Sequence, residues 1–307
     1  MASSSTPTRP RTASSRTTGS RRSSPSASGR SPTTPCSRTS RVDCCRATPM
    51  TESVTPDVSV IVTAHSETVV CGPTMRSADL AIEAARAHGY VVETVIALDG
   101  ATDETREYFD QQRYDHWDRW DFQEADLGRV RNAAVTRSTG RYIAFLDADD
   151  LFSENWLVEG IAVLDAAARD GRRVIAHPEL NVMFDGGNSV LVHIDQSSPL
   201  FTPWFAYLRN YHDSLCLTPR EAHVAIPYVS RDIPNGLSFQ DWQFSIESMA
   251  AGWEHVLVRD TIIFKRRRDA SLGQESSNRR SIVRKLPAMA IDRVHDLARV
   301  GKASETA

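Results

Sequence analysis

The stretch YIAFLDADD, from Tyr142 to Asp150, decides how this sequence is interpreted. Its first five residues are predominantly apolar and predict a short buried β-strand. Three carboxylates follow within four residues, and they repel one another unless a cation is present. Hard divalent cations prefer oxygen ligands and bridge to substrate phosphates. The turn therefore predicts a Mg²⁺ or Mn²⁺ site beside a diphosphate, or else a solvated acidic loop at the start of the next helix.

Strand-like and helix-like segments alternate around this stretch. Apolar, β-branched runs predict strands at 58–62, 91–98, 142–146 and from 174 onward, and an extended segment at 254–264. Helical spacing predicts helices over 75–88, from an Asp103 cap to about 112, over 129–139, from a Ser153 cap to 169, and over 240–252. This alternation predicts βαβ units and a mainly parallel sheet covered by helices.

Polar side chains follow the predicted strands where each strand ends. Thr63 and His65 follow the first strand, Asp99 ends the second, and Asp147 and Asp149 follow the third. In parallel sheets, ligands bind at the carboxyl ends of strands. We therefore expect one ligand site at this edge. The Gly-Arg-Val-Arg-Asn segment at 128–132 opens a helix, which suits an anionic ligand or a solvated basic helix start.

Charge and composition divide the chain into unequal parts. Residues 1–50 contain nine Arg, no Lys and one acid, a charge of +8, so the remaining residues carry −11 of the net −3. That Ser/Arg-rich segment lacks apolar residues and predicts a disordered tail, or translation that begins at Met50. The acidic remainder argues against nucleic-acid binding. The five cysteines show no metal-ligand spacing and indicate free thiols in a cytoplasmic protein.

Five segments together resemble the family 2 glycosyltransferases of GT-A fold. In chain order they are VSVIVTAHSE at 58–67, LDGATD at 98–103, GRVRN at 128–132, FLDADD at 145–150 and QDW at 240–242. The resemblance covers about two-thirds of the chain. It implies a Rossmann-like αβα sandwich, the fold of nucleotide-diphospho-sugar transferases, over residues 51–270, with a C-terminal helical extension at 271–307.

The resemblance also implies a role for each matching residue. Thr63, His65, Glu67, Asp99, Arg131, Asp147 and Ala148 would bind the nucleotide sugar. Asp149 would ligate the divalent metal, Asp241 would be the general base, and Trp242 would shape the acceptor pocket. A base is needed because a sugar hydroxyl is a poor nucleophile.

The sequence departs from the family pattern at several of these places. Leu98 replaces the first Asp of the Asp-Asp-Gly turn, and Gln240 replaces a Glu, which leaves Asp241 as the only candidate base. Some relatives carry a metal-binding His after the last strand, where this chain has Lys265 to Arg268. Those cations either stabilise the leaving diphosphate or form a solvated basic run.

The expected activity is metal-assisted, inverting transfer of a sugar from a UDP- or GDP-hexose to an acceptor hydroxyl. Acceptors left open are a surface polysaccharide, a lipid-linked sugar, a protein and a small metabolite. No stretch predicts a membrane span, and peripheral membrane association stays open. The alternatives are a haloacid-dehalogenase-like phosphatase, a nucleotidyltransferase and a non-catalytic nucleotide-sugar-binding module. The aromatic run at 201–211 predicts an acceptor wall or ordinary core packing.

Overall fold

The computed structural model describes residues 55–268 and 271–300, and the side chain of residue 272 is not among the described ones. These described residues belong to one compact unit. The predicted tail at 1–50 lies outside the described residues. The boundary predicted at residue 270 stays a prediction.

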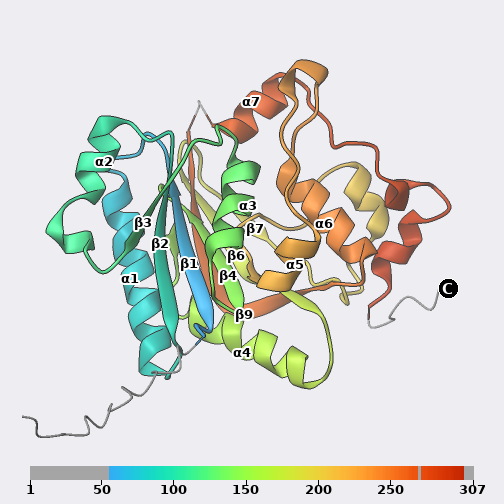
Figure 1. The fold of residues 1–307 in the computed structure, drawn as a ribbon. Coiled ribbons are helices and arrows are strands. Elements are labelled where there is room, and N and C mark those ends of the chain that lie inside the picture. Colours follow the sequence, from blue (N-terminus) through green and yellow to red (C-terminus); the bar gives the residue numbers. More distant parts are fainter. Residues whose placement is uncertain (1–54, 269–270, 301–307) are drawn as a thin grey trace, which may run out of the picture. The chain divides into compact units, whose positions relative to one another are not determined.

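A nine-stranded mixed sheet forms the centre of this unit, in the order β3-β2-β1-β4-β8-β6-β9-β5, with β7 paired to β6 (Figure 1). Its strands are β1 (Val58–Ala64), β2 (Val92–Asp99), β3 (Asp118–Phe122), β4 (Tyr142–Asp147), β5 (Leu151–Phe152), β6 (Val174–Asp185), β7 (Ser189–Val192), β8 (Leu217–Pro219) and β9 (Glu254–Arg267). Strands β3, β2, β1 and β4 are mutually parallel, and β6 is parallel to β9. The antiparallel β8 joins β4 to β6, so the long strands all end at the same edge.

Helices cover both faces of the sheet. They are α1 (Cys71–Ala87), α2 (Asp103–Phe109), α3 (Leu127–Arg137), α4 (Trp156–Arg169), α5 (Arg220–Ala225), α6 (Gln240–Ala250) and α7 (Leu272–Asn278). Helices α1 and α4 pack together on one face, and α3 packs with α5 on the other, where α6 also lies (Figure 1). The predicted Rossmann-like αβα sandwich is thus confirmed. Five 3₁₀ segments complete the described part, at Gln112–Tyr114, Pro203–Tyr207, Ile233–Asn235, Pro287–Met289 and Val294–Ala298.

The core lies between the sheet and its helices and explains why the strand predictions were right. All seven residues of β1 are buried, because parallel strands covered on both faces have no solvent side. The same holds for five of the six residues of β4, the strand that precedes the acidic turn. A second, smaller core holds Ile246, Met249, Leu286, Val294 and Leu297, so the segment after residue 270 packs against α6.

Two predicted helix caps are wrong. Ser153 does not cap α4, because its hydroxyl accepts from the backbone N–H of Ile262 on β9. Asp103 is the first residue of α2, whose cap is Thr102. In both places the residue type was suited to capping, but a tertiary contact or a neighbouring hydroxyl decided the position.

Candidate active site

The strand ends bring most of the predicted site residues to one edge of the sheet. Register pairs Thr63 of β1 with Asp147 of β4 and with Ala97 of β2. Ala148 follows directly, and its backbone N–H donates to the carbonyl of Thr63 at 3.0 Å. Its own carbonyl accepts from the hydroxyl of Thr74 in α1. These bonds fix the acidic turn against the first strand and the first helix.

Asp147 is held by two donors. Its Oδ1 accepts from Thr63 Oγ1 at 3.0 Å and from a guanidinium nitrogen of Arg131 at 2.6 Å. Burial opposes ionisation of Asp147, but the charges of Arg131 and Lys265 and the hydrogen bonds from Arg131 and Thr63 together outweigh it and lower the pKa of this carboxyl. Arg131 is itself 3% exposed. It therefore positions Asp147 instead of projecting freely toward a ligand.

Asp149 and Glu67 share one cation. Arg268, just past β9, lies 3.2 Å from Asp149 Oδ2 through Nε and 3.1 Å from Glu67 Oε1 through its terminal nitrogen. Burial raises the pKa of Asp149, Arg268 opposes this, and the charges of Asp147 and Glu67 add to the rise. The pocket thus holds more negative charge than Arg268 balances. Glu67 also accepts from the backbone N–H groups of His65 and Ser66.

Lys265 connects the acidic turn to the opposite side of the site. Its ammonium lies 3.2 Å from Asp150 Oδ2 and 2.8 Å from Asp213 Oδ1. Burial raises the pKa of Asp150 to about 7. Burial acts in the same direction on Asp213, but Lys265 outweighs it and lowers that pKa to about 2. Asp213 therefore supplies most of the charge that balances Lys265, and the predicted alternative of a solvated basic run is wrong for this residue.

Asp241 lies in the first turn of α6, next to this charge network. Its Oδ2 accepts from the Asn210 amide at 3.3 Å. Burial and the nearby charge of Asp213 raise the pKa of Asp241. A carboxylate destabilised in this way is a stronger proton acceptor than a solvated one. Trp242, the next residue, packs into the smaller core and donates its indole N–H to the Ala206 carbonyl at 3.1 Å.

Two of the recognised segments touch each other. The Gln240 amide donates to Asp126 Oδ1 at 2.8 Å, and Asp126 also caps α3 through the Arg129 N–H. A Cβ added at Gly128 would lie 2.4 Å from Gln240 Nε2. Glycine is thus required at this position because the side chain at the start of α6 lies against the helix backbone. The Gly-Arg-Val-Arg-Asn and Gln-Asp-Trp segments therefore form one unit.

Asp99 and His65 bind protein groups as well as lining the edge. Asp99 Oδ1 accepts from the backbone N–H groups of Glu124 and Ala125, at 2.6 and 3.3 Å. The exposed His65 ring places Nδ1 2.7 Å from the Asp99 carbonyl. The His65 contact joins the ends of β1 and β2, and the Asp99 carboxylate joins the end of β2 to the segment after β3. The edge of His65 and the second Asp99 oxygen are the groups at this end of the site that a base or ribose would meet.

Three site residues escaped the sequence analysis. Asp126, Asn210 and Asp213 lie in irregular segments without a strand or helix period. Only Asp126 carried a local signal: it stands immediately before the glycine-containing start of α3, and Asp is a suitable N-cap residue. Asn210 and Asp213 lie some thirty residues before Asp241 along the chain, and folding alone brings them to it.

The oxygen donors of the acidic turn fit a divalent cation. Asp149 offers a carboxylate in a locality of excess negative charge, and Mg²⁺ or Mn²⁺ typically binds through one or two carboxylates and substrate phosphates. Within the described residues, however, no three acidic, histidine or cysteine ligand atoms of the turn lie within 4.8 Å of one another. Asp149 is therefore the candidate protein ligand, with phosphate oxygens completing the shell.

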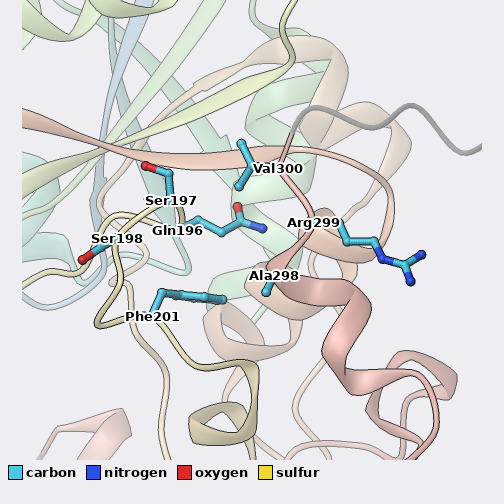
Figure 2. Close-up of a pocket in the computed structure, with 7 residues that line it drawn as sticks. All are labelled: Gln196, Ser197, Ser198, Phe201, Ala298, Arg299 and Val300. Carbon is cyan, nitrogen blue, oxygen red and sulfur yellow. The ribbon is translucent and has the colours of Figure 1, made fainter.

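Two cavities lie away from this edge. One of about 460 Å³ is lined by Gln196, Ser197, Ser198, Phe201, Ala298, Arg299 and Val300 (Figure 2). A second, of about 220 Å³, includes Glu254 and His255 at the start of β9. The start of β9 is at the opposite edge of the sheet from Asp147. These cavities are therefore separate from the strand ends that gather the predicted residues.

The aromatic run at 201–211 is divided between packing and exposure. Tyr211 packs against Phe201 and against Phe205, with ring centroids 4.7 Å apart in each pair. Trp204 and Tyr207 remain 47% and 43% exposed and stack on each other. The exposed pair is the part of the run that could meet a ligand.

In the described residues, no helix has both the length and the hydropathy required to cross a membrane.

One protein-family model matches part of this chain. Residues 59–178 match the model of Glycosyl transferase family 2. No curated protein sequence matches this chain. TarS from S. aureus is similar in fold. Its 1–349 fragment in complex with UDP-GlcNAc superposes with a TM-score of 0.53 at 15% identity, over 72% of this chain and 61% of that one.

Two other TarS structures give the same result. The 1–349 fragment without a named ligand has a TM-score of 0.50 at 16% identity, over 68% of this chain and 60% of that one. Crystalline TarS has a TM-score of 0.52 at 15% identity, over 69% of this chain and 37% of that one. This chain thus spans less than two-thirds of each of these proteins. Residues 59–178 therefore resemble glycosyl transferase family 2, and the chain has the GT-A fold.

Proposed function

We propose that this protein is an inverting glycosyltransferase that moves a hexose from a UDP- or GDP-linked donor to an acceptor hydroxyl. One observation carries the proposal: Asp147, paired with Arg131, and Asp149, paired with Arg268, form one acidic turn, and Asp241 on α6 lies beside the Asp213–Lys265 pair that also holds Asp150 of this turn. The family match over residues 59–178 supports it. A nucleotide-sugar-binding module would need the acidic turn but no base beside it.

The donor would lie along the carboxyl ends of β1, β2 and β4. His65 and Asp99 would face the base, Thr63 and Glu67 the ribose region, and Asp147 with Ala148 the ribose side of the diphosphate. A divalent cation held by Asp149 would neutralise the diphosphate and favour its departure. Arg268, already bound to Asp149 and Glu67, would add positive charge at the same place.

Asp241 would act on the acceptor. Its carboxylate removes the proton of the acceptor hydroxyl as that oxygen bonds to the anomeric carbon, while the bond from this carbon to the diphosphate oxygen breaks. The products are the glycoside and the nucleoside diphosphate, with the proton on Asp241. One carboxylate base and attack opposite the leaving group give inversion. Asn210 would orient Asp241, and Trp242 with the exposed Trp204 and Tyr207 would border the acceptor.

The first test is binding. Thermal shift of the full chain with UDP, GDP, ADP and CMP, each with and without Mn²⁺, measures which ligand stabilises the native state. A ligand at 100 times its Kd adds about 2.7 kcal/mol to the free energy of unfolding. We expect stabilisation by UDP or GDP that increases with Mn²⁺ and is lost in Asp149→Asn. The absence of any nucleotide response would overturn the proposed function.

Asp241→Asn tests the base. We expect release of nucleoside diphosphate from the sugar donor to fall by about 10²–10⁴-fold, because the positioned proton acceptor is lost. Nucleotide binding should stay within a few-fold, since Asp241 contacts the acceptor side. Glu247→Gln, on the same helix but bonded to Gln243, is the matched control and should keep full turnover. Undiminished turnover in Asp241→Asn would show that another group is the base.

A further inference from the structure

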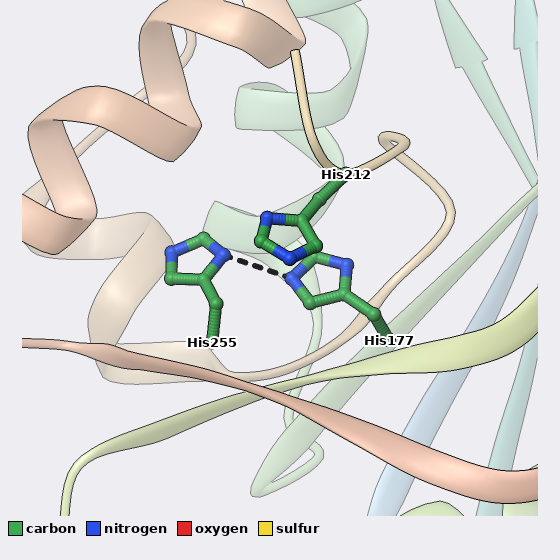
Figure 3. Close-up of side chains that lie close together, drawn as sticks. All are labelled: His177, His212 and His255. Atoms are coloured by element: carbon green, nitrogen blue, oxygen red, sulfur yellow. Dashed lines mark hydrogen bonds between the residues drawn. The ribbon is translucent and has the colours of Figure 1, made fainter. Parts of the chain in front are cut away.

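A buried histidine cluster lies outside the proposed donor site. His177 of β6, His255 of β9 and His212 of the loop before β8 are each at most 2% exposed. Register pairs His255 with Ile175, two residues before His177, so both side chains point to the same face of the sheet. The three imidazoles gather beneath α6 (Figure 3). We define this group as the histidine cluster.

The partners of each ring fix its tautomer. His212 Nε2 lies 2.8 Å from the Ile194 carbonyl, which can only accept, so Nε2 carries the proton and Nδ1 has the lone pair. Ser248 Oγ donates to the Phe244 carbonyl at 2.7 Å and thus accepts from His255 Nε2 at 2.9 Å. His255 Nδ1 is then the acceptor for His177 Nε2 at 2.9 Å.

This arrangement leaves two lone-pair nitrogens without donors. His177 Nδ1 and His212 Nδ1 are buried and have no hydrogen-bond partner among the described residues. A buried polar atom without a partner typically costs about 1–3 kcal/mol. Carbonyls, hydroxyls and other imidazoles surround the cluster, and no carboxylate hydrogen-bonds to any of its three rings in the described structure. The cluster therefore has nitrogen lone pairs to which no group in the described structure donates a hydrogen bond.

The ligand nitrogens are close enough together for a metal ion, and the His212 ring, which stacks on His177 with centroids 4.2 Å apart, would turn toward the ion on binding. One ligand nitrogen from each ring lies within 4.8 Å of the other two. Zinc–nitrogen bonds of about 2.0–2.1 Å place tetrahedral ligand nitrogens about 3.3 Å apart. The His177–His255 pair, at 2.9 Å, needs to open by only a few tenths of an ångström. Ligation through His177 Nε2 would move the proton of that neutral ring to Nδ1, so the unpartnered lone pair that the ion would use directly is that of His212 Nδ1.

The anchoring bonds match those of metal-binding histidines. A ligating imidazole usually donates its second N–H to a carbonyl, carboxylate or other acceptor, which fixes the ring. His255 does so to Ser248, and His212 to Ile194. An all-imidazole set favours Zn²⁺ and its borderline neighbours over Mg²⁺ or Mn²⁺, which prefer oxygen. The cluster therefore differs in metal preference from the Asp149 site.

The histidine cluster lies next to a cavity, although its three side chains are buried. The cavity of about 220 Å³ is lined by His255 together with Asp195 and Glu254. Two carboxylates at its wall would attract a cation, although Glu254 is also paired with Arg172.

We propose that His177, His212 and His255 bind a borderline divalent cation such as Zn²⁺, at a site separate from that of Asp149. The ion would tie the loop at 208–213 to β6 and β9. That loop carries Asn210 and Asp213, which contact Asp241 and Lys265. The metal is thus structural, and it holds the partners of the proposed base in place.

The test uses the full chain with any affinity tag removed. The protein is stripped with a chelator, dialysed against Zn²⁺ and analysed for bound metal by mass spectrometry. Co²⁺ is then added in place of Zn²⁺, and its visible absorption is recorded. We expect one retained equivalent of Zn²⁺, a tetrahedral-type Co²⁺ spectrum and a higher melting temperature with Zn²⁺ in the wild type.

Three variants assign the ion. His212→Phe keeps a stacked ring but lacks nitrogen, and it should lose the retained equivalent and the Co²⁺ band. His223→Phe is the matched control: His223 is equally buried and stacks on Phe244 outside the cluster. It should retain the metal, as should Asp149→Asn. Zn²⁺ retained equally in His212→Phe, or none in the wild type, would overturn the proposal.

A second measurement covers the case in which His212→Phe does not fold. X-ray absorption of Zn²⁺-loaded wild type should show a first shell of nitrogen with imidazole scattering. A shell of oxygen alone would place the ion on carboxylates and refute the assignment. Neither readout depends on turnover, so this inference and the proposed transferase activity fail or stand separately.

Discussion

The role of each charged residue in this protein depends on the charged groups that folding places beside it. Lys265 is 12% exposed at the side chain, with Asp150 and Asp213 on either side. In the sequence it is the first of four consecutive cations. Only Lys265 among them enters the interior. Arg266 pairs with Asp185, and Arg268 reaches the acidic turn. Neighbours in the chain thus have three different roles.

Lys265→Met should lower the free energy of unfolding by about 3–5 kcal/mol, since it leaves a buried carboxylate without its partner. Urea denaturation measures this loss. Arg259→Met removes an exposed pair with Glu179 and serves as the control, with an expected loss under about 1 kcal/mol. Adding Asp213→Asn to Lys265→Met should recover part of the loss. A fully additive double variant would contradict the proposed pairing.

At the scale of elements, close approach between α3 and α6 determines the shape of the site. Gly128 in the first turn of α3 lies against Gln240 at the start of α6. A Cβ added at Gly128 would also lie 3.0 Å from the Cβ of Tyr228. The position of Asp241 on α6 therefore depends on a glycine more than a hundred residues earlier. A residue of higher helix propensity at position 128 would stabilise α3 by itself, but its side chain would displace α6.

Gly128→Ala should destabilise the protein by about 1–3 kcal/mol, because overpacking outweighs the gain in helix propensity. Gly273→Ala in α7 is the matched control: nothing lies within 4 Å of its added Cβ, so stability should stay level or rise. Thermal unfolding compares the two. Gly128→Ala combined with Gln240→Ser should regain part of the lost stability, and equal behaviour of both glycines would exclude the clash.

On the scale of the whole molecule, buried histidines couple stability to pH. Burial, with the charge of Arg131 adding to it, lowers the pKa of His223 to about 3. Phe145, Tyr228 and Phe244 surround its ring. Above about pH 6.5 the ring is neutral in both the folded and the unfolded chain, so its contribution to stability is complete. Between pH 6.5 and 3 only the unfolded chain takes up the proton, so stability falls as pH falls.

His223→Leu should make that fall less steep by up to about 1.4 kcal/mol per pH unit between pH 6 and 4. Denaturant unfolding at several pH values provides the slopes. His88→Leu, an exposed residue at the end of α1, is the control and should leave the slope as in the wild type. Identical slopes for His223→Leu and wild type would mean that the folded protein accommodates a charged His223.

Much of the site follows from local pattern, and the remainder needed contacts between distant segments. The strands that end at Ala64, Asp99 and Asp147 could be predicted, because each is a short apolar run followed by polar residues. The strands β3, β5, β7 and β8 were missed, since they are short or lack a clear period. Asp213 and Asn210 carried no local signal, because their partners are 52 and 31 residues away.

The sequence by itself determined the class of fold, the edge of the sheet where polar groups gather and the acidic turn from Tyr142 to Asp150. Local hydrophobic period and residue type are sufficient for these, since they act within a few residues. Only the tertiary structure decided how the carboxylates are used: Asp147 with Arg131, Asp149 with Arg268, and Asp150 with Lys265. Charge pairing and burial depend on groups far apart in the chain, and they alone gave neighbouring aspartates different pKa values.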